Sequence, residues 1–187
     1  MVENFVNEKE MDHITAMLTH AKFEDSHTDN LAGEAIYDTS RTSTFTHIPF
    51  RVNDVIRRIE SRATSIVNVT SDKIEPIQVV RYTQGQEFGL HHDSGSIDEE
   101  GRIQDVVPPR RDATFFVYLN DLPEGAGGET EFPLIGLKVR PRRGCALLFC
   151  NVLENGELDH RVIHRALPVL GDHWKLGMNI WILGHSF

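Results

Sequence analysis

The segment VVRYTQGQEFGLHHDS (Val79–Ser94) decides how the rest of this sequence is interpreted. It begins as a β-branched run typical of a buried strand, breaks at a turn around Gly85, and ends on a histidine and a carboxylate. Side chains of an extended segment alternate between two faces, so His91 and Asp93 should point to one side and His92 to the other. The segment therefore predicts two ligands of a metal ion, and a third ligand has to come from elsewhere in the chain.

The composition restricts the class of protein. The chain has 187 residues, of which 40% are hydrophobic and 25% are charged. These values predict one globular domain, large enough to be a catalytic domain, over residues 1–187. The formal net charge is −9, and basic residues occur in no run longer than a pair. Because such a chain is poorly suited to holding phosphate backbones, we expect no nucleic-acid partner.

The hydrophobicity pattern and the cysteines point to the same cellular compartment. No apolar stretch is long enough to span a bilayer, and the N-terminus lacks an apolar leader segment. Cys145 and Cys150 should lie on opposite faces of a strand, which disfavours a disulfide and suits a reducing compartment. We therefore predict a soluble cytoplasmic protein without a membrane partner.

The first third of the chain shows helical periodicity in two places. Asn7 and Glu10 resemble a capping box, and the apolar residues that follow predict a helix to about His20. A second amphipathic pattern runs from Pro49 to Ile66. Between them, a strand is predicted near residues 34–38, and residues 40–44 are too polar for a core strand.

Past Ile66 the chain consists of short strand-like runs separated by turn residues. The runs are Pro76–Tyr82, Phe88–His92, Thr114–Leu119, Leu137–Val139, Ala146–Cys150, Arg161–Arg165 and Lys175–Leu183. Many short strands without intervening helices predict a mainly β fold, an antiparallel sandwich or jelly roll. Residues 67–187 would form this core, and residues 1–66 a support region whose helices brace one sheet.

The segment from Ser94 to Asp112 follows the metal-binding pair directly. It contains two glycines, an acidic run and two consecutive prolines, and it is longer than most loops. We predict an irregular lid over the site.

The third metal ligand should come from a later strand. Candidates are His160, His164, His173 and His185. His164 is preferred because the apolar residues 162–163 carry it into the sheet, whereas His160 and His185 are predicted to be surface histidines.

Two histidines and one carboxylate on one face leave half of an octahedron open, as in non-haem Fe(II) oxygenases. Open positions imply a co-substrate. If that co-substrate is a 2-oxo acid, a buried cation should be present for its far carboxylate.

Several motifs resemble, in order, those of the prolyl 4-hydroxylase-like group of 2-oxoglutarate- and Fe(II)-dependent dioxygenases. They are Tyr82-x-x-Gly85-Gln86-x-Phe88-x-x-His91-x-Asp93, Thr114-x-x-x-Tyr118-Leu119-Asn120-Asp121, Gly127-Gly128-Glu129-Thr130-x-Phe132-Pro133, Pro141-x-x-Gly144-x-Ala146-Leu147-Leu148-Phe149 and His164-x-x-x-Pro168-Val169, followed by Lys175 and Trp181. The resemblance implies a double-stranded β-helix (jelly-roll) fold with iron held by His91, Asp93 and His164. It also implies that O2 and 2-oxoglutarate are consumed, with decarboxylation to succinate and hydroxylation of a C–H bond, and that ascorbate (vitamin C) serves as reductant.

The motif that supplies the residue for the far carboxylate of 2-oxoglutarate departs from the family pattern. The family usually carries Pro-Val-x-x-Gly-x-Lys-Trp, whereas this chain reads Pro168-Val-Leu-Gly-Asp-His-Trp-Lys175. Counting back from Trp181 through the strand selects Lys175 for the far carboxylate, and His173 stays a second candidate on the same strand face. By resemblance, Tyr82 and Thr130 hydrogen-bond the co-substrate.

The resemblance also suggests a substrate. Arg111 would meet a substrate carbonyl and Trp181 would wall the substrate pocket. The expected reaction is hydroxylation at C4 of a peptidyl proline in an extended, proline-containing segment. Alternatives are the same chemistry on a free amino acid or other small metabolite, and a non-catalytic iron-binding sensor. A nucleic-acid demethylase is disfavoured by the acidic charge and by the lack of that group's closing arginine motif.

Overall fold

The computed structural model describes residues 1–29, 35–37, 39–98, 100–105 and 110–184. The helices are α1 (Glu8–Leu18), α2 (Asp54–Ile66) and two short 3-10 turns, η1 (Pro133–Ile135) and η2 (His160–Val162). The strands are β1 (Glu24–Asp25), β2 (Thr28–Asp29), β3 (Ala35–Ile36), β4 (Thr44–Ile48), β5 (Ile77–Tyr82), β6 (Phe88–His91), β7 (Gly95–Ile97), β8 (Ile103–Asp105), β9 (Arg111–Tyr118), β10 (Thr130–Phe132), β11 (Leu137–Val139), β12 (Ala146–Cys150), β13 (His164–Ala166) and β14 (Lys175–Leu183).

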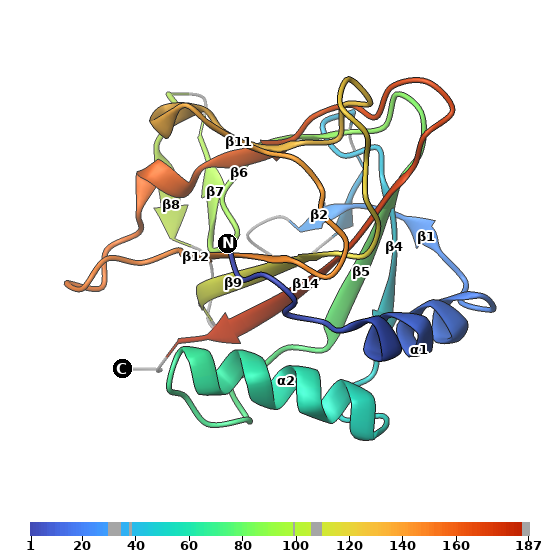
Figure 1. Ribbon diagram of the computed structural model, residues 1–187. Helices are drawn as coiled ribbons and strands as arrows, with labels where there is room; N and C mark the ends of the chain where they lie inside the picture. The colour runs from blue at the N-terminus through green and yellow to red at the C-terminus, as the bar shows by residue number, and fades with distance from the viewer. Residues whose placement is uncertain (30–34, 38, 99, 106–109, 185–187) are drawn as a thin grey trace.

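Two antiparallel sheets form the body of the molecule (Figure 1). Among the described residues, the larger sheet has six strands in the order β1-β4-β5-β14-β9-β12, and the smaller has four in the order β11-β10-β13-β6. Neighbours in space are mostly distant in sequence, as expected for strands that alternate between the layers of a jelly roll. The predicted mainly β fold class is confirmed.

Alternation along the strands gives the larger sheet two different faces. Phe115 and Val117 pack with helix residues in one apolar core, whereas Phe116 and Tyr118 point to the other side. That second side faces the smaller sheet, with Phe132 among its contacts. The site described below lies on this inner face.

Both helices lie against the outer face of the larger sheet (Figure 1). α1 begins with the predicted capping box, in which the Asn7 side chain accepts from the Glu10 amide and the Glu10 carboxylate accepts from the Asn7 amide. α2 begins at Asp54, capped by Asn53, and not at Pro49 as the periodicity indicated. An Asn side chain that accepts two amide protons is a stronger start signal than apolar spacing.

Two other sequence-based expectations were wrong. Residues 161–165 do not form one strand, because η2 precedes β13 and only the residues from His164 onward pair with a neighbour. Thr44, expected to be too polar for a core strand, starts β4, which pairs with β5 inside the larger sheet. Pairing with a partner distant in sequence outweighs the polar composition of such a segment.

The segment Ser94–Asp112 is also more regular than predicted. β7 and β8 form an antiparallel ladder, and β9 begins at Arg111. Residues 99 and 106–109, like residues 34, 38 and His185, lie outside the described residues. The function of this hairpin as a lid, and the division of the chain at residue 66, stay predictions.

Two smaller expectations concern the cysteines and the membrane. Cys145 is buried, Cys150 is exposed, and both are free, in agreement with their predicted opposite orientation. In the described part of the chain, no helix combines the length and the apolar character needed to cross a bilayer.

Candidate metal centre

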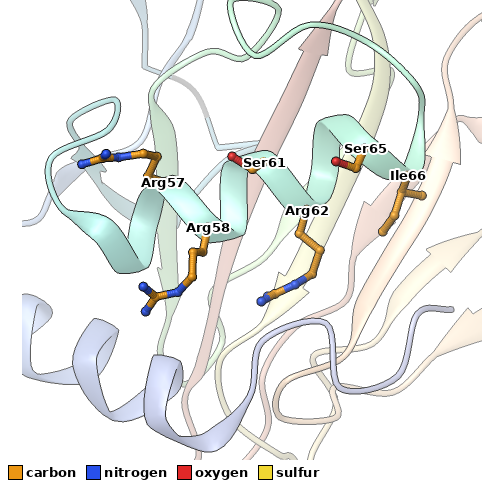
Figure 2. Close-up of a pocket in the computed structure, with 6 residues that line it drawn as sticks. All are labelled: Arg57, Arg58, Ser61, Arg62, Ser65 and Ile66. Carbon is orange, nitrogen blue, oxygen red and sulfur yellow. The ribbon is translucent and has the colours of Figure 1, made fainter.

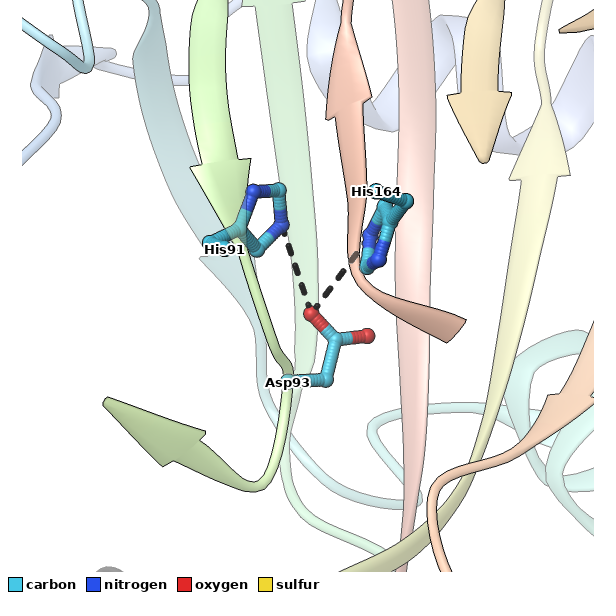
Figure 3. Close-up of side chains that lie close together, drawn as sticks. All are labelled: His91, Asp93 and His164. Carbon is cyan, nitrogen blue, oxygen red and sulfur yellow. Dashed lines mark ion pairs between the residues drawn. The ribbon is translucent and has the colours of Figure 1, made fainter. Parts of the chain in front are cut away.

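His91, Asp93 and His164 meet at the end of the smaller sheet, on the inner side of the sandwich (Figure 3). His91 at the end of β6 lies opposite His164 at the start of β13 in the strand register. Asp93 Oδ1 is 3.5 Å from His91 Nε2 and 3.8 Å from His164 Nε2. One ligand atom from each residue lies within 4.8 Å of the others. The tertiary structure thus brings together the three residues predicted from sequence.

Backbone carbonyls orient both imidazoles. Nδ1 of His91 lies 2.8 Å from the Gly89 carbonyl oxygen, and Nδ1 of His164 lies 2.9 Å from that of Val162. A carbonyl oxygen only accepts, so each Nδ1 carries the proton and each Nε2 offers a lone pair. Hydrogen bonding of the second ring nitrogen to a carbonyl is the usual arrangement for histidine ligands of metals.

Aromatic rings hold the imidazoles in place. Phe88 stacks on His91 with ring centroids 3.7 Å apart. Phe132 and Phe149 lie 5.2 Å and 5.0 Å from His164. These contacts restrict both rings to the orientation that the carbonyls select.

The protonation states suit a divalent cation. Burial, with His91 nearby, lowers the pKa of His164 to about 3, so its imidazole is neutral at pH 7. Burial alone would raise the pKa of Asp93, but His164, His91 and Thr114 hold it well below the ordinary value. The centre therefore offers two imidazoles and one carboxylate, a donor set that fits Fe(II) and leaves coordination positions open.

Lys175 lies at the other end of the same inner face. Its side chain is 0% exposed, and Nζ has no hydrogen-bond partner among the described residues. Nζ lies 5.1–5.8 Å from the ring centroids of Phe116, Tyr82 and Tyr118. Burial lowers the pKa of Lys175 to about 7, against the opposing influence of Glu129. A buried amine without a hydrogen-bond partner is costly, and such a position suits a residue that pairs with the carboxylate of a ligand.

His173, the second candidate from sequence, is exposed. Gly128, on the turn beside Lys175, has φ of 72°. A Cβ built there would lie 2.5 Å from Leu122 and 3.6 Å from Cδ of the lysine, so glycine keeps this space open. The geometry supports Lys175 rather than His173.

Three hydroxyl side chains surround the space near Lys175. Tyr82 is buried and lies directly opposite Lys175 in the pairing of β5 with β14. Burial raises the pKa of Tyr82, which keeps its hydroxyl a hydrogen-bond donor. The Tyr118 hydroxyl donates to Thr130 Oγ1 at 2.9 Å. Tyr82 thus pairs with Lys175 across the strands and Thr130 bonds Tyr118, and their hydrogen bonds to 2-oxoglutarate stay predictions.

Arg111 and Trp181, predicted to contact substrate, both contact Asp93 in this structure. Trp181 Nε1 lies 3.3 Å from Asp93 Oδ2, and Arg111 lies 3.4 Å from the Asp93 carbonyl oxygen. Arg111 also forms a two-point ion pair with Glu75 at 2.6 and 2.8 Å. Their roles toward substrate stay predictions.

The sequence-based interpretation missed Thr114, Tyr118 and Asn151 as members of the site. The Thr114 hydroxyl donates to Asp93 Oδ2 at 2.6 Å, and the Asn151 amide donates to Thr114 Oγ1 at 3.1 Å. Alternation along β9 places Thr114 and Tyr118 on one face, and this signal could have identified both. Asn151 follows β12 and gave no such signal, because only tertiary structure brings it to β9.

His92 and His160 behave as expected. His92 is buried on the far side of β6, and its Nδ1 accepts from the Ser94 amide. His160 is exposed.

A surface hollow of about 570 Å³ is lined by residues of α2, which are Arg57, Arg58, Ser61, Arg62, Ser65 and Ile66 (Figure 2). It lies on the helix side of the larger sheet, opposite the metal-binding face. Arg57 pairs with Asp54, and Arg62 pairs with Glu10. The hollow is therefore separate from the candidate metal centre.

A jelly roll that holds an open two-histidine, one-carboxylate centre beside a buried cation has the features of a non-haem oxygenase. A sequence profile of the 2OG-Fe(II) oxygenase superfamily matches residues 77–183. The chain belongs to this superfamily. Membership confirms the predicted enzyme class and, at the level of the family, the predicted dependence on Fe(II) and 2-oxoglutarate.

Similar proteins agree with the predicted prolyl 4-hydroxylase-like group. The chain is 33% identical over 129 residues to prolyl 4-hydroxylase subunit alpha-1 of Gallus gallus, covering 68% of this chain and 24% of that protein. It is 28% identical to probable prolyl 4-hydroxylase 7 of Arabidopsis thaliana, covering 100% of this chain and 63% of that protein. The chain thus spans less than two thirds of each of these curated relatives.

Among solved structures, the viral collagen prolyl hydroxylase vCPH from Paramecium Bursaria Chlorella virus-1, in its 2OG complex, is 26% identical. The TM-score is 0.73, over 98% of this chain and 94% of that chain.

Proposed function

We propose that this chain is a 2-oxoglutarate- and Fe(II)-dependent dioxygenase that hydroxylates C4 of a prolyl residue in an extended protein segment. The observation that carries the proposal is the buried Lys175, whose Nζ has no hydrogen-bond partner in the part of the chain that the structure describes, on the same inner face as the open centre of His91, Asp93 and His164. The names of the three similar proteins described above, each a prolyl hydroxylase, support the substrate class.

The residues present fit the two groups. His91, Asp93 and His164 would hold the iron, which supplies the activation of dioxygen when it is bound. Lys175 would pair with the far carboxylate of 2-oxoglutarate, with Tyr82 and Thr130 donating further hydrogen bonds. The ring walls of Tyr82, Phe116 and Tyr118 exclude water around this ion pair, which strengthens it.

The test combines the protein with Fe(II), ascorbate, 2-oxoglutarate and a library of proline-containing peptides. We expect succinate formation and a gain of one oxygen in a peptide, located on proline C4 by fragmentation. Oxygen transferred only to a free amino acid or other small metabolite would keep the chemistry and change the substrate. Iron binding without succinate under any condition would favour the sensor.

The depressed pKa of Lys175 predicts how the affinity for 2-oxoglutarate depends on pH. An ammonium is needed to pair with the carboxylate, and the free protein loses this proton as the pH rises through about 7. The affinity should therefore be greatest below pH 7 and fall by up to about tenfold per pH unit above it. Calorimetric dissociation constants between pH 6.5 and 9 provide the measurement.

Lys175→Arg is the matched control for this pH dependence, because a guanidinium stays charged throughout that range. The ratio of the two dissociation constants at each pH cancels any titration at the metal centre. A ratio that does not change with pH would contradict the prediction.

A further inference from the structure

We propose that Thr114 and Trp181 are positioning residues that make Asp93 bind the metal through a single oxygen, Oδ1. The inference rests on the proposed metal centre and goes beyond it, since it explains how the centre keeps positions open.

The two oxygens of Asp93 have different partners. Oδ2 accepts from the Thr114 hydroxyl at 2.6 Å and from the Trp181 indole N–H at 3.3 Å. Oδ1 has neither donor and faces the Nε2 atoms of the two histidines. The carboxylate side chain is only 7% exposed, so water competes little for either oxygen.

The direction of the Thr114 hydrogen bond is fixed by Asn151. Its amide Nδ2 donates to Thr114 Oγ1 at 3.1 Å, and the amide is fully buried. A hydroxyl that accepts from Asn151 directs its single proton elsewhere, and Asp93 Oδ2 is the acceptor within reach.

The orientation of Trp181 is fixed from the other side. Trp181 lies directly opposite Thr114 in the pairing of β14 with β9, so both donors project from one place on the inner face. The Arg111 guanidinium lies 3.6 Å from the Trp181 ring centroid, and Glu75 holds that guanidinium by two hydrogen bonds. Ring and guanidinium therefore restrain each other.

Two donors on one carboxylate oxygen use the lone pairs that a second bond to metal would need. A carboxylate that binds through both oxygens fills two coordination positions, whereas one that binds through a single oxygen fills one. Holding Oδ2 away thus leaves an additional position for co-substrate or dioxygen. Both donors, Thr114 and Trp181, lie on strands, which hold side chains more precisely than loops do.

The experiment uses Co(II), whose visible absorption reports its coordination, as a probe in place of iron. Thr114→Val removes the hydroxyl at nearly constant shape, and we expect the dissociation constant for Co(II) to rise by about 10- to 100-fold. The absorption spectrum should change as well, because Oδ2 is released. Thr114→Ser keeps the hydroxyl and should restore both the spectrum and the affinity.

Trp181→Phe provides an independent variant, since it keeps an aromatic ring beneath Arg111 and removes the N–H together with part of the indole. We expect a smaller rise in the dissociation constant, and the largest spectral change when both donors are absent. Thermal unfolding of the metal-free proteins shows whether each variant folds. If Thr114→Val does not fold, Trp181→Phe alone carries the test.

Two results would overturn the inference. One is an unchanged affinity and spectrum in folded Thr114→Val and Trp181→Phe proteins. The other is a Thr114→Ser protein as impaired as Thr114→Val, because packing and not the hydroxyl would then be responsible. Failure of the unsubstituted protein to bind Co(II) or Fe(II) at all would instead refute the metal centre, and the inference with it.

Discussion

Replacing His91 with alanine is expected to abolish iron binding and turnover, whereas replacing its neighbour His92 should leave iron binding largely intact. His91 Nε2 faces Asp93 Oδ1 at 3.5 Å, while the His92 side chain points to the opposite side and accepts from the Ser94 amide. Loss of one of three protein ligands leaves too few donors to hold Fe(II) against water. Equilibrium dialysis with Fe(II) under anaerobic conditions, together with succinate formation, provides the measurement.

The pair of variants separates ligation from general damage, because both remove an imidazole from adjacent positions. His92 is buried, so His92→Ala should lower the melting temperature somewhat without changing the iron stoichiometry. His160→Ala, on an exposed side chain, serves as a second control. Equal loss of iron in the His91 and His92 variants would argue against the proposed ligand set.

Replacing Lys175 with methionine should weaken 2-oxoglutarate binding by roughly 10- to 150-fold, which corresponds to the loss of about 1.5–3 kcal/mol from a hydrogen bond to a charged group. Methionine fills nearly the same space, so the packing against Phe116 and Tyr82 is kept. The apparent KM for 2-oxoglutarate and the dissociation constant measured by calorimetry both report the effect.

The same substitution should raise the melting temperature of the protein without co-substrate. Lys175 is fully buried and has no hydrogen-bond partner among the described residues, so the folded state gains when this polar group is removed. Opposite changes in stability and affinity are typical of a residue kept for binding.

His173→Ala is the control for the lysine. His173 is exposed and lies two residues before Lys175. Its replacement should change neither the affinity for 2-oxoglutarate nor the melting temperature. A larger loss of affinity in His173→Ala than in Lys175→Met would reverse the assignment of the carboxylate partner.

Strands marked by local sequence patterns could be predicted, whereas strands that depend on pairing with distant residues could not. β11, β12 and β14 have the predicted bounds, because alternation and turn residues define a short buried strand locally. β4 was missed, since its polar threonines are acceptable only because they pair with β5, in the register Thr44 to Arg81 and Thr46 to Val79. The sequence could not place the start of α2 from apolar spacing, although the cap at Asn53 was a local signal.

The sequence by itself determined the chemical identity of the site. His91, Asp93, His164 and Lys175 follow from residue type, from the two-residue period of strands and from the order of the family motifs. These signals depend only on neighbouring residues or on the order of motifs along the chain, so they can be recognised without the tertiary structure.

Only the tertiary structure decided what surrounds these residues. It placed Thr114 and Trp181 on one oxygen of Asp93, turned His173 outward and enclosed Lys175 with no hydrogen-bond partner from the described ranges. Each of these facts depends on which strand lies beside which, as in the pairing of β14 with β5 and β9. Pairing between distant strands is set by burial and packing of the whole domain, and no local pattern in the sequence specifies it.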